Sequence, residues 1–159
     1  MSFEIIRLSE KDAAAAAEIE KLCFSHPWSE ATMASEMKNQ FSDFFGAFSD
    51  GKLAGYIGGR TIAGETEIFN VGVAPEFRRC GIGKSLVERF ISAAKEKETD
   101  VIYLEVRTSN LGAINLYEKA GFVFCGIRKD YYDDPKENAI LMRLAFDGTQ
   151  EYEDWDDEE

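Results

Sequence analysis

Two glycines and three basic residues form the stretch whose chemistry is clearest from the sequence. Gly81 and Gly83 stand one residue apart where a helix is predicted to begin, and Arg78, Arg79 and Lys84 flank them. A helix N-terminus presents amides without intrahelical acceptors and a partial positive charge. Glycine has no Cβ, so the backbone can approach an anion closely. The pattern therefore predicts a phosphate-binding loop.

The spacing around these glycines excludes two common nucleotide-binding loops. A dinucleotide fingerprint needs a third glycine three residues after the second, where this chain has Leu86. The run Gly83-Lys84-Ser85 fits the end of a Walker loop, but Arg78 stands where that loop requires its first glycine. From this stretch alone, a tight turn with exposed arginines remains the alternative.

The elements predicted around the loop are those of one α/β domain. Asp50-Gly51 is typical of a type I′ hairpin turn, Ser29 can cap a short helix that runs to about Met37, and Asn110 can cap another. We predict strands at residues 4–8, 44–48, 53–62, 65–73, 101–106, 122–128 and 139–146, and further helices at 13–22, 82–97 and 111–120. This order predicts a mixed, strongly twisted sheet of about seven strands with about four helices on both faces.

Charge divides the chain into two parts. The net charge is −12, and residues 147–159 contain eight acids and no base. Subtracting these eight charges leaves −4 for residues 1–146. We expect residues 1–146 to form the domain and 147–159 to be a solvated, disordered acidic tail. The acidic balance disfavours nucleic-acid binding and suits a basic partner.

Cysteine and histidine usage gives no sign of a metal site. Cys23, Cys80 and Cys125 are far apart and His26 is the single histidine, so we expect neither a zinc site nor a disulfide framework. No apolar run approaches the ~20 residues that span a bilayer, and the first residues do not resemble a secretory signal. We therefore expect a cytoplasmic protein that does not bind membranes. The sequence leaves the oligomeric state open.

Several motifs resemble those of one enzyme family. The stretch from Arg78 to Gly83 resembles the Gln/Arg-x-x-Gly-x-Gly/Ala motif of the GNAT acetyltransferases. The run Leu104-Glu105-Val106-Arg107-Thr108-Ser109-Asn110 and the segment 113–122 are similar to the branch of that family that acetylates the N-terminal alanine of ribosomal proteins. Further similarities lie at 27–29, 69–71 and 128–132, and the resemblance covers roughly residues 3–146. Glu137-Asn138-Ala139 departs from the Glu-Asp-Ala common in the family, which bears on how a peptide is held.

The resemblance implies an activity, a co-substrate and a set of site residues. The activity is acetyl transfer from acetyl-CoA to the N-terminal α-amine of a protein, in this branch the N-terminal alanine of a basic small-subunit ribosomal protein. Glu105 matches the general base and Tyr117 the general acid, while Asn110 matches a contact to the cofactor arm. The backbone of Val71, Gly72 and Val73 matches the pantetheine-binding strand, and the amides of Arg79, Cys80, Gly81, Ile82, Gly83 and Lys84 match the pyrophosphate loop.

The two candidate catalytic side chains are chemically suited to these roles. Glu105 interrupts an apolar strand, where desolvation would raise its pKa and make it a better base. Tyr117 is a phenol that can give a proton to a departing thiolate. The alternatives without a catalytic role are that Glu105 is an acid that faces outward from the strand and that Tyr117 is an aromatic side chain packed on its helix. Backbone amides where the strands 65–73 and 101–106 splay apart could stabilise an oxyanion.

Two other functions stay open at this point. One is acetyl transfer to a lysine or a small-molecule amine, and the other is a non-catalytic acetyl-CoA-binding module. The pair Tyr131-Tyr132 favours a peptide acceptor, because aromatic walls suit an extended chain. The presence of both Glu105 and Tyr117 favours an enzyme over a silent module.

Overall fold

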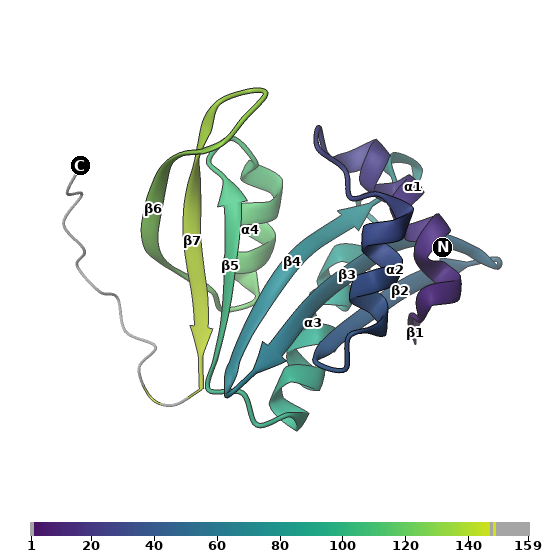
Figure 1. Cartoon of the computed structure of the whole chain (residues 1–159), viewed down its shortest axis with the longest axis horizontal. Helices are drawn as coiled ribbons and strands as arrows, with labels where there is room; N and C mark the ends of the chain where they lie inside the picture. The colour runs from purple at the N-terminus through teal and green to yellow at the C-terminus, as the bar shows by residue number, and fades with distance from the viewer. Residues whose placement is uncertain (1, 147, 149–159) are drawn as a thin grey trace.

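A computed structural model describes residues 2–146 and 148, which form a single seven-stranded sheet with four α-helices (Figure 1). The strands are β1 (Glu4–Arg7), β2 (Ser42–Ser49), β3 (Lys52–Ile62), β4 (Glu65–Val73), β5 (Val101–Arg107), β6 (Val123–Tyr132) and β7 (Glu137–Ala145). The helices are α1 (Ala13–Cys23), α2 (Glu30–Lys38), α3 (Ile82–Glu96) and α4 (Leu111–Lys119), with short 3₁₀ helices at Glu10–Asp12 and Pro75–Phe77. The predicted fold class is confirmed. The predicted acidic tail, 147–159, lies outside the described residues except for Gly148.

The sheet is mixed, with strand order β1-β2-β3-β4-β5-β7-β6. Among the strands of the described residues, only β4 and β5 pair in parallel, and α3 forms the crossover between them. Helices α1 and α2 cover one face of the sheet over β2–β4, whereas α3 and α4 cover the opposite face (Figure 1). Two hydrophobic cores result, one on each side of the sheet.

The larger core lies between the sheet and α3. Ile82, Leu86 and Phe90 recur on one side of α3 and are each no more than 1% exposed. This spacing of four residues places an apolar stripe on one helix face, as predicted from the sequence. The core holds the N-terminus of α3, and therefore the glycine loop, against the end of β4.

Strands β4 and β5 pair over only part of their length. Their register runs from Glu65 opposite Val101 to Glu67 opposite Tyr103, and no later pair joins them. A bulge lies just beyond this point, because Gly58 of β3 pairs with Asn70 while Gly59 pairs with Ile68, which leaves Phe69 as an extra residue. The predicted splay between the two strands is thus present, and the outer half of β4 has an edge that β5 does not cover.

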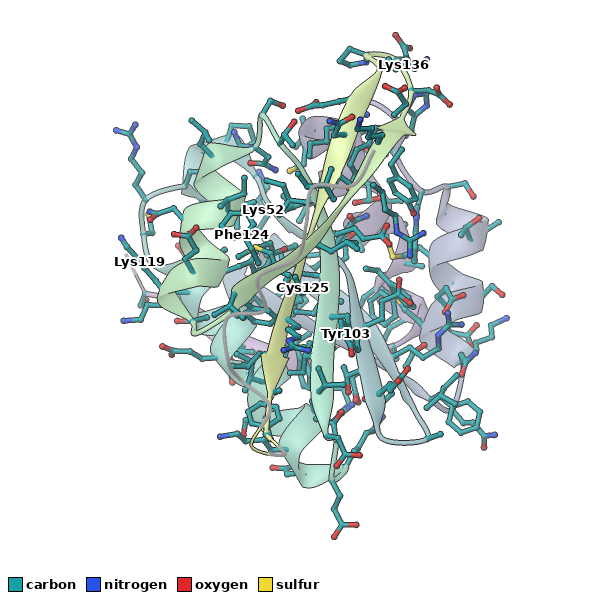
Figure 2. All side chains as sticks on the ribbon, turned by 90° about the vertical axis from the view of Figure 1, so that its left-hand side faces the viewer. Lys52, Tyr103, Lys119, Phe124, Cys125 and Lys136 are labelled. Carbon is teal, nitrogen blue, oxygen red and sulfur yellow. The ribbon has the colours of Figure 1, made fainter. Side chains whose placement is uncertain are left out.

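The β6–β7 hairpin is longer than predicted. The sequence predicted strands at 122–128 and 139–146, whereas the hairpin extends to Tyr132 paired with Glu137, with Lys136 at its tip (Figure 2). The added residues of β6 are mostly exposed and end in two tyrosines, the added residues Glu137 and Asn138 of β7 are half-buried, and none of them forms an alternating apolar pattern. The pair Tyr132–Glu137 closes the hairpin beyond an irregularity that follows Arg128, and strand periodicity in the sequence does not reveal such a pairing.

Asp43 of β2 gives a test of the fold that is independent of function. Its buried carboxylate accepts a hydrogen bond from Arg7 and lies 2.7 Å from Lys97 Nζ. Burial acts to raise the pKa of Asp43, but the contacts with Lys97 and Arg7 outweigh it and hold the pKa below its usual value. The ionised carboxylate therefore contributes stability at neutral pH. This contribution begins to be lost below the ordinary aspartate pKa of about 3.9, and it disappears as the pH falls through the lowered pKa of Asp43 in the folded protein.

We expect Asp43→Asn to lower the free energy of unfolding by about 2 kcal/mol at neutral pH, because two cations lose their charged partner. Urea titrations of both proteins at neutral pH and well below the ordinary aspartate pKa would measure this. The difference between the proteins should shrink at the lower pH. An equal difference at both pH values would contradict the role of the charge.

Candidate active site

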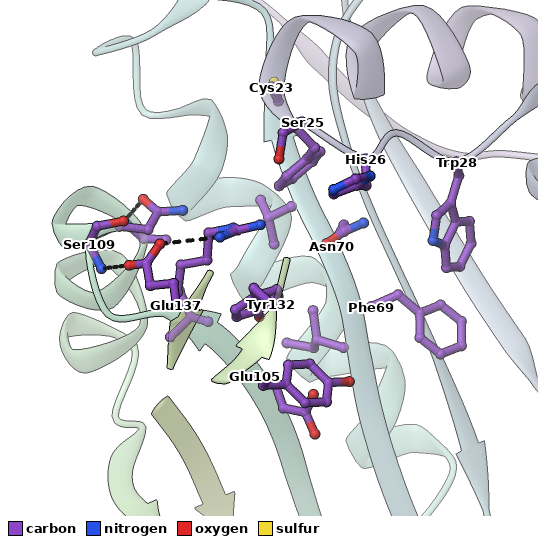
Figure 3. Close-up of a pocket in the computed structure, with 18 of the residues that line it drawn as sticks. Cys23, Ser25, His26, Trp28, Phe69, Asn70, Glu105, Ser109, Tyr132 and Glu137 are labelled. Atoms are coloured by element: carbon purple, nitrogen blue, oxygen red, sulfur yellow. Dashed lines mark hydrogen bonds and ion pairs between the residues drawn. The ribbon is translucent and has the colours of Figure 1, made fainter. Parts of the chain in front are cut away.

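A pocket of about 710 Å³ opens where β4 and β5 splay apart (Figure 3). Its walls come from the α1–α2 connection, β4, β5, the start of α4 and the β6–β7 hairpin. Four of the residues predicted from the sequence line it: Val71, Glu105, Asn110 and Tyr117. The structure therefore brings the candidate base and the candidate acid to one pocket, although they lie on different elements.

Tyr117 is buried on α4 and faces this pocket. The residue is 6% exposed, and its ring meets Phe122 edge-on with 5.7 Å between ring centroids. Burial raises the pKa of the Tyr117 hydroxyl above its ordinary value, and the neighbouring Tyr132 adds to the shift. Among the described residues no partner accepts a hydrogen bond from this hydroxyl. The phenol therefore stays protonated at neutral pH and has a proton to give.

Glu105 lies on the face of β5 that points away from the larger core. Its neighbours Leu104 and Val106 are buried, whereas the Glu105 side chain is 23% exposed. Arg128 Nε is 3.3 Å from Glu105 Oε1, and a hydrogen bond to Glu105 raises the pKa of Tyr131. Glu105 thus has polar and charged neighbours from β6, rather than the apolar surroundings that its place in the strand suggested.

Gly81 adopts a backbone conformation that side chains disfavour. It is the residue before α3 and has φ 82° and ψ 8°, in the left-handed region. A Cβ at Gly81 would meet nothing within 4 Å, so backbone strain rather than space is what restricts this position. Arg79 is also left-handed, with φ 63°. At Gly83 the reason is different, since a Cβ would lie 3.3 Å from Leu116 Cδ2, where α3 approaches α4.

The other predicted cofactor-binding residues lie next to the pocket rather than in its lining. Gly72 and Val73 end β4, and Arg79, Cys80, Gly81, Ile82, Gly83 and Lys84 follow in the loop and the first turn of α3. Cys23 connects the two regions, because it lines the pocket and its Sγ lies 3.5 Å from the Val73 carbonyl oxygen. The same carbonyl accepts a hydrogen bond of 3.0 Å from Arg78 Nε.

These features fit a ligand with a phosphate-bearing arm. The first turn of α3 has amides without intrahelical acceptors, and the left-handed Gly81 leaves no side chain in front of them. Asn110 Oδ1 accepts a 3.2 Å hydrogen bond from the Ala113 amide, which confirms the predicted cap. Its side-chain nitrogen remains to contact a ligand. The uncovered edge of β4 joins the loop to the pocket.

We expect Gly81→Val to weaken acetyl-CoA binding at least tenfold, which corresponds to about 1.4 kcal/mol. Valine is strained at a φ of 82° and would place a branched Cβ beside the helix amides. Isothermal titration calorimetry on the folded variant measures the change. Gly51→Val is a matched control, since Gly51 has φ 78° and open space in the β2–β3 turn, outside the loop and the pocket lining. Unchanged affinity in Gly81→Val would remove the loop from the binding site.

Sequence reasoning missed a clamp that holds the β6–β7 hairpin over the pocket. Arg107 donates hydrogen bonds to the carbonyls of Pro135 and Asp133, at 2.9 and 3.0 Å. Glu137 lies 3.2 Å from Arg107 and accepts hydrogen bonds from the Ser109 amide and the Thr108 hydroxyl (Figure 3). The contacts with Ser109, together with those from Thr108 and Arg107, lower the pKa of Glu137 to about 2.

The clamp joins three parts of the pocket. It ties the hairpin to the end of β5 and to the residues that start α4, so Tyr132 and Asn110 are held relative to each other. Arg107 also stacks on the Tyr132 ring at 4.3 Å from its centroid. The Asn138 side chain accepts a 2.9 Å hydrogen bond from the Asp130 amide within the hairpin. In the sequence, this region was marked only by the resemblance of residues 104–110 and 128–132 to family motifs and by the departure from the family motif at 137–139.

Aromatic side chains face each other across the pocket. Trp28 and Phe69 lie on one side, with 5.3 Å between ring centroids, and Tyr131 and Tyr132 lie on the other, 5.0 Å apart. His26 lies in the wall beside Trp28 (Figure 3). The predicted aromatic wall is therefore present, with a second wall opposite that the sequence did not predict.

Two further observations concern only the described part of the chain. Within it, no three His, Cys, Asp or Glu side chains gather closely enough to hold a metal ion, and Cys23, Cys80 and Cys125 are free. No helix in residues 2–146 is long and apolar enough to cross a membrane.

Comparison with known proteins agrees with this geometry. The model of the acetyltransferase (GNAT) family matches residues 13–122. The ribosomal protein bS18-alanine N-acetyltransferase of Escherichia coli strain K12 is 37% identical over 142 residues, which cover 88% of this chain and 95% of that protein. The N-alpha-acetyltransferase RimI of Mycobacterium tuberculosis is 37% identical over 142 residues, which cover 86% of this chain and 88% of that protein.

A solved structure shows the same likeness in three dimensions. The crystal structure of the ribosomal-protein-S18-alanine N-acetyltransferase from Escherichia coli has a TM-score of 0.84 and 35% sequence identity, over 95% of this chain and 99% of that one. The family model spans well over half of the chain, and the seven-stranded sheet agrees with the family's fold. The chain therefore belongs to the acetyltransferase (GNAT) family and is an acetyltransferase.

Proposed function

We propose that this enzyme transfers the acetyl group of acetyl-CoA to the N-terminal α-amine of a protein, and that its acceptor is the N-terminal alanine of ribosomal protein bS18. The observation that carries the proposal is the pocket at the splay of β4 and β5, where Glu105 and Tyr117 face one cavity beside the glycine loop. The name of the Escherichia coli relative supplies the acceptor, and the name of the Mycobacterium tuberculosis relative supplies the α-amine.

In this proposal Glu105 acts as the general base. When bound, acetyl-CoA supplies the acetyl group as a thioester. An α-amine has a pKa of about 8, against about 10.4 for a lysine side chain, so a useful fraction of it is neutral near pH 7. A carboxylate can then take the proton that the nitrogen loses as the new amide bond forms, directly or through a water. Glu105 is accessible for this because its side chain is 23% exposed in the pocket wall.

Tyr117 acts as the general acid. The thiolate that leaves when the carbon–sulfur bond breaks needs a proton, and the Tyr117 hydroxyl keeps its own because burial raises its pKa. The bulge at Phe69 and the uncovered edge of β4 offer backbone amides to the developing negative charge on the acyl oxygen. No covalent bond to the enzyme is required, so Cys23 and Cys80 need not react.

The shape of the pocket supports a peptide acceptor. The aromatic pairs Trp28–Phe69 and Tyr131–Tyr132 form opposing walls, and the clamped hairpin fixes one of them. Such walls suit the first residues of an extended chain that enters with its amine toward Glu105.

Steady-state kinetics of thiol release from acetyl-CoA test this function. The acceptors to compare are a peptide with the N-terminal sequence of bS18, the same peptide with a blocked N-terminus, and a polyamine. We expect turnover with the free peptide and essentially none with the blocked one. Efficient turnover of the polyamine alone would instead show a small-molecule acetyltransferase.

A further inference from the structure

Glu20 is a carboxylate that the mechanism above does not use. It lies on α1, is 0% exposed, and is not part of the pocket lining. A buried carboxylate is costly unless hydrogen-bond donors surround it. Its position in the sequence is consistent with this burial, since Ala13, Ala16 and Ala17 precede it on the buried face of the same helix.

Three donors from three different parts of the chain converge on Glu20. Tyr56 Oη of β3 donates to Oε2 at 2.6 Å, and the backbone amide of Trp28 donates to Oε1 at 3.0 Å. Asn70 Nδ2 of β4 lies 3.3 Å from both carboxylate oxygens. Burial raises the pKa of Glu20, and these three hydrogen bonds oppose the rise. All three partners donate hydrogen bonds to Glu20, and an ionised carboxylate, which only accepts hydrogen bonds, is the form that can accept all of them.

This arrangement determines which way the Asn70 amide faces. An ionised carboxylate only accepts hydrogen bonds, so the nitrogen of Asn70 must point toward Glu20 and its oxygen must point away. Figure 3 shows the Asn70 oxygen on the side of the pocket where Tyr132 lies. Asn70 is half-buried and lines the pocket, and no described residue donates a hydrogen bond to its oxygen.

The neighbours of Asn70 are held by the same carboxylate. The backbone amide of Trp28 donates a hydrogen bond to Glu20, and the Trp28 ring makes a tilted contact with Phe69, the extra residue of the β4 bulge. The buried Glu20 side chain thus holds the wall of the pocket that Trp28, Phe69 and Asn70 form. This wall presents the side-chain oxygen of Asn70 beside the two aromatic rings.

We propose that Asn70 is a specificity-determining residue whose side-chain oxygen accepts a hydrogen bond from an N–H group of the acceptor's first residue, and that Glu20 is the positioning residue that turns the Asn70 amide for this contact. The inference rests on the proposed function, since it needs an amine-bearing acceptor in the pocket. Glu20 itself does not touch the acceptor.

The test uses the full-length enzyme, acetyl-CoA and a peptide with a free N-terminal alanine. Asn70→Ala and Glu20→Gln should each raise the KM for the peptide at least tenfold, which is the loss of one well-placed hydrogen bond, at about 1.4 kcal/mol. The turnover number and the affinity for acetyl-CoA should change by no more than about twofold. In Glu20→Gln the side chain offers an amide, so Asn70 is no longer forced to direct its oxygen into the pocket.

Two controls separate positioning from a general loss of structure. Asp43→Asn disrupts the buried contacts with Arg7 and Lys97 and involves neither Glu20 nor Asn70, so it should lower the melting temperature without raising the KM for the peptide. Adding Glu20→Gln to Asn70→Ala should raise the KM no further, because Glu20 acts through Asn70. An additional rise in KM in the double variant, or an equal rise in Asp43→Asn, would overturn the positioning role of Glu20.

If Glu20→Gln does not fold, the KM of the Asn70→Ala variant decides the test on its own. An unchanged KM for the peptide in that variant would overturn the inference while leaving the proposed function intact. Failure of the proposed function looks different, because the wild-type enzyme itself would then not acetylate the peptide.

Discussion

Replacing Tyr117 with phenylalanine is expected to lower the turnover number about 100-fold while leaving acetyl-CoA affinity unchanged. General acid catalysis contributes on the order of 100-fold or more, and the substitution removes only the hydroxyl. The pKa of Tyr117 is raised by burial, so the hydroxyl is protonated in the wild-type enzyme throughout the neutral pH range. Steady-state kinetics with saturating acetyl-CoA and calorimetry of acetyl-CoA binding measure the two quantities.

Tyr103→Phe is the matched control for this experiment. Tyr103 is a 38% exposed tyrosine on β5 that does not line the active-site pocket. It should retain wild-type turnover. A Tyr117→Phe enzyme with the turnover number of the wild type would show that another group protonates the leaving thiolate.

The second large effect is expected for Glu105→Gln. The amide keeps the size of the side chain but cannot accept a proton, so we expect the turnover number to fall about 100-fold. In the wild type the rate should decrease at low pH as the base becomes protonated, and in the variant this acidic limb should flatten. The pH dependence of kcat for both enzymes is the measurement.

Glu67 supplies the comparison that makes the Glu105 result specific. It is a second carboxylate in the pocket lining, and Arg60 lies 3.9 Å from it. Glu67→Gln should keep both the acidic limb and most of the turnover. If Glu67→Gln loses the acidic limb and Glu105→Gln keeps it, the two carboxylates have been assigned the wrong way round.

Local signals in the sequence predicted the features that depend on a few adjacent residues. Asp50 and Gly51 both have positive φ, as a type I′ turn requires, and Ser29 accepts a hydrogen bond from the Thr32 amide. Helix α3 begins at Ile82, directly after Gly81, as predicted. In each case the backbone preference of one or two residues is enough to determine the structure.

Long-range contacts explain what the sequence did not predict. Glu20 is joined to Asn70 across 50 residues and to Tyr56 across 36, and Arg107 is joined to Pro135 across 28. No periodicity carries such information. The polar neighbours of Glu105 were not predicted for the same reason, because Arg128 and Tyr131 reach it from a strand later in the chain.

The most direct test of the account is to locate the acetyl group on the acceptor. Ribosomal protein bS18 with a free N-terminal alanine would be incubated with the enzyme and acetyl-CoA, and the product analysed by intact mass and fragmentation mass spectrometry. We expect a single added acetyl group on the α-amine and none on lysine side chains. Acetylation of lysines with a free α-amine, or no acetylation of bS18 by an enzyme that acetylates another amine, would contradict the account.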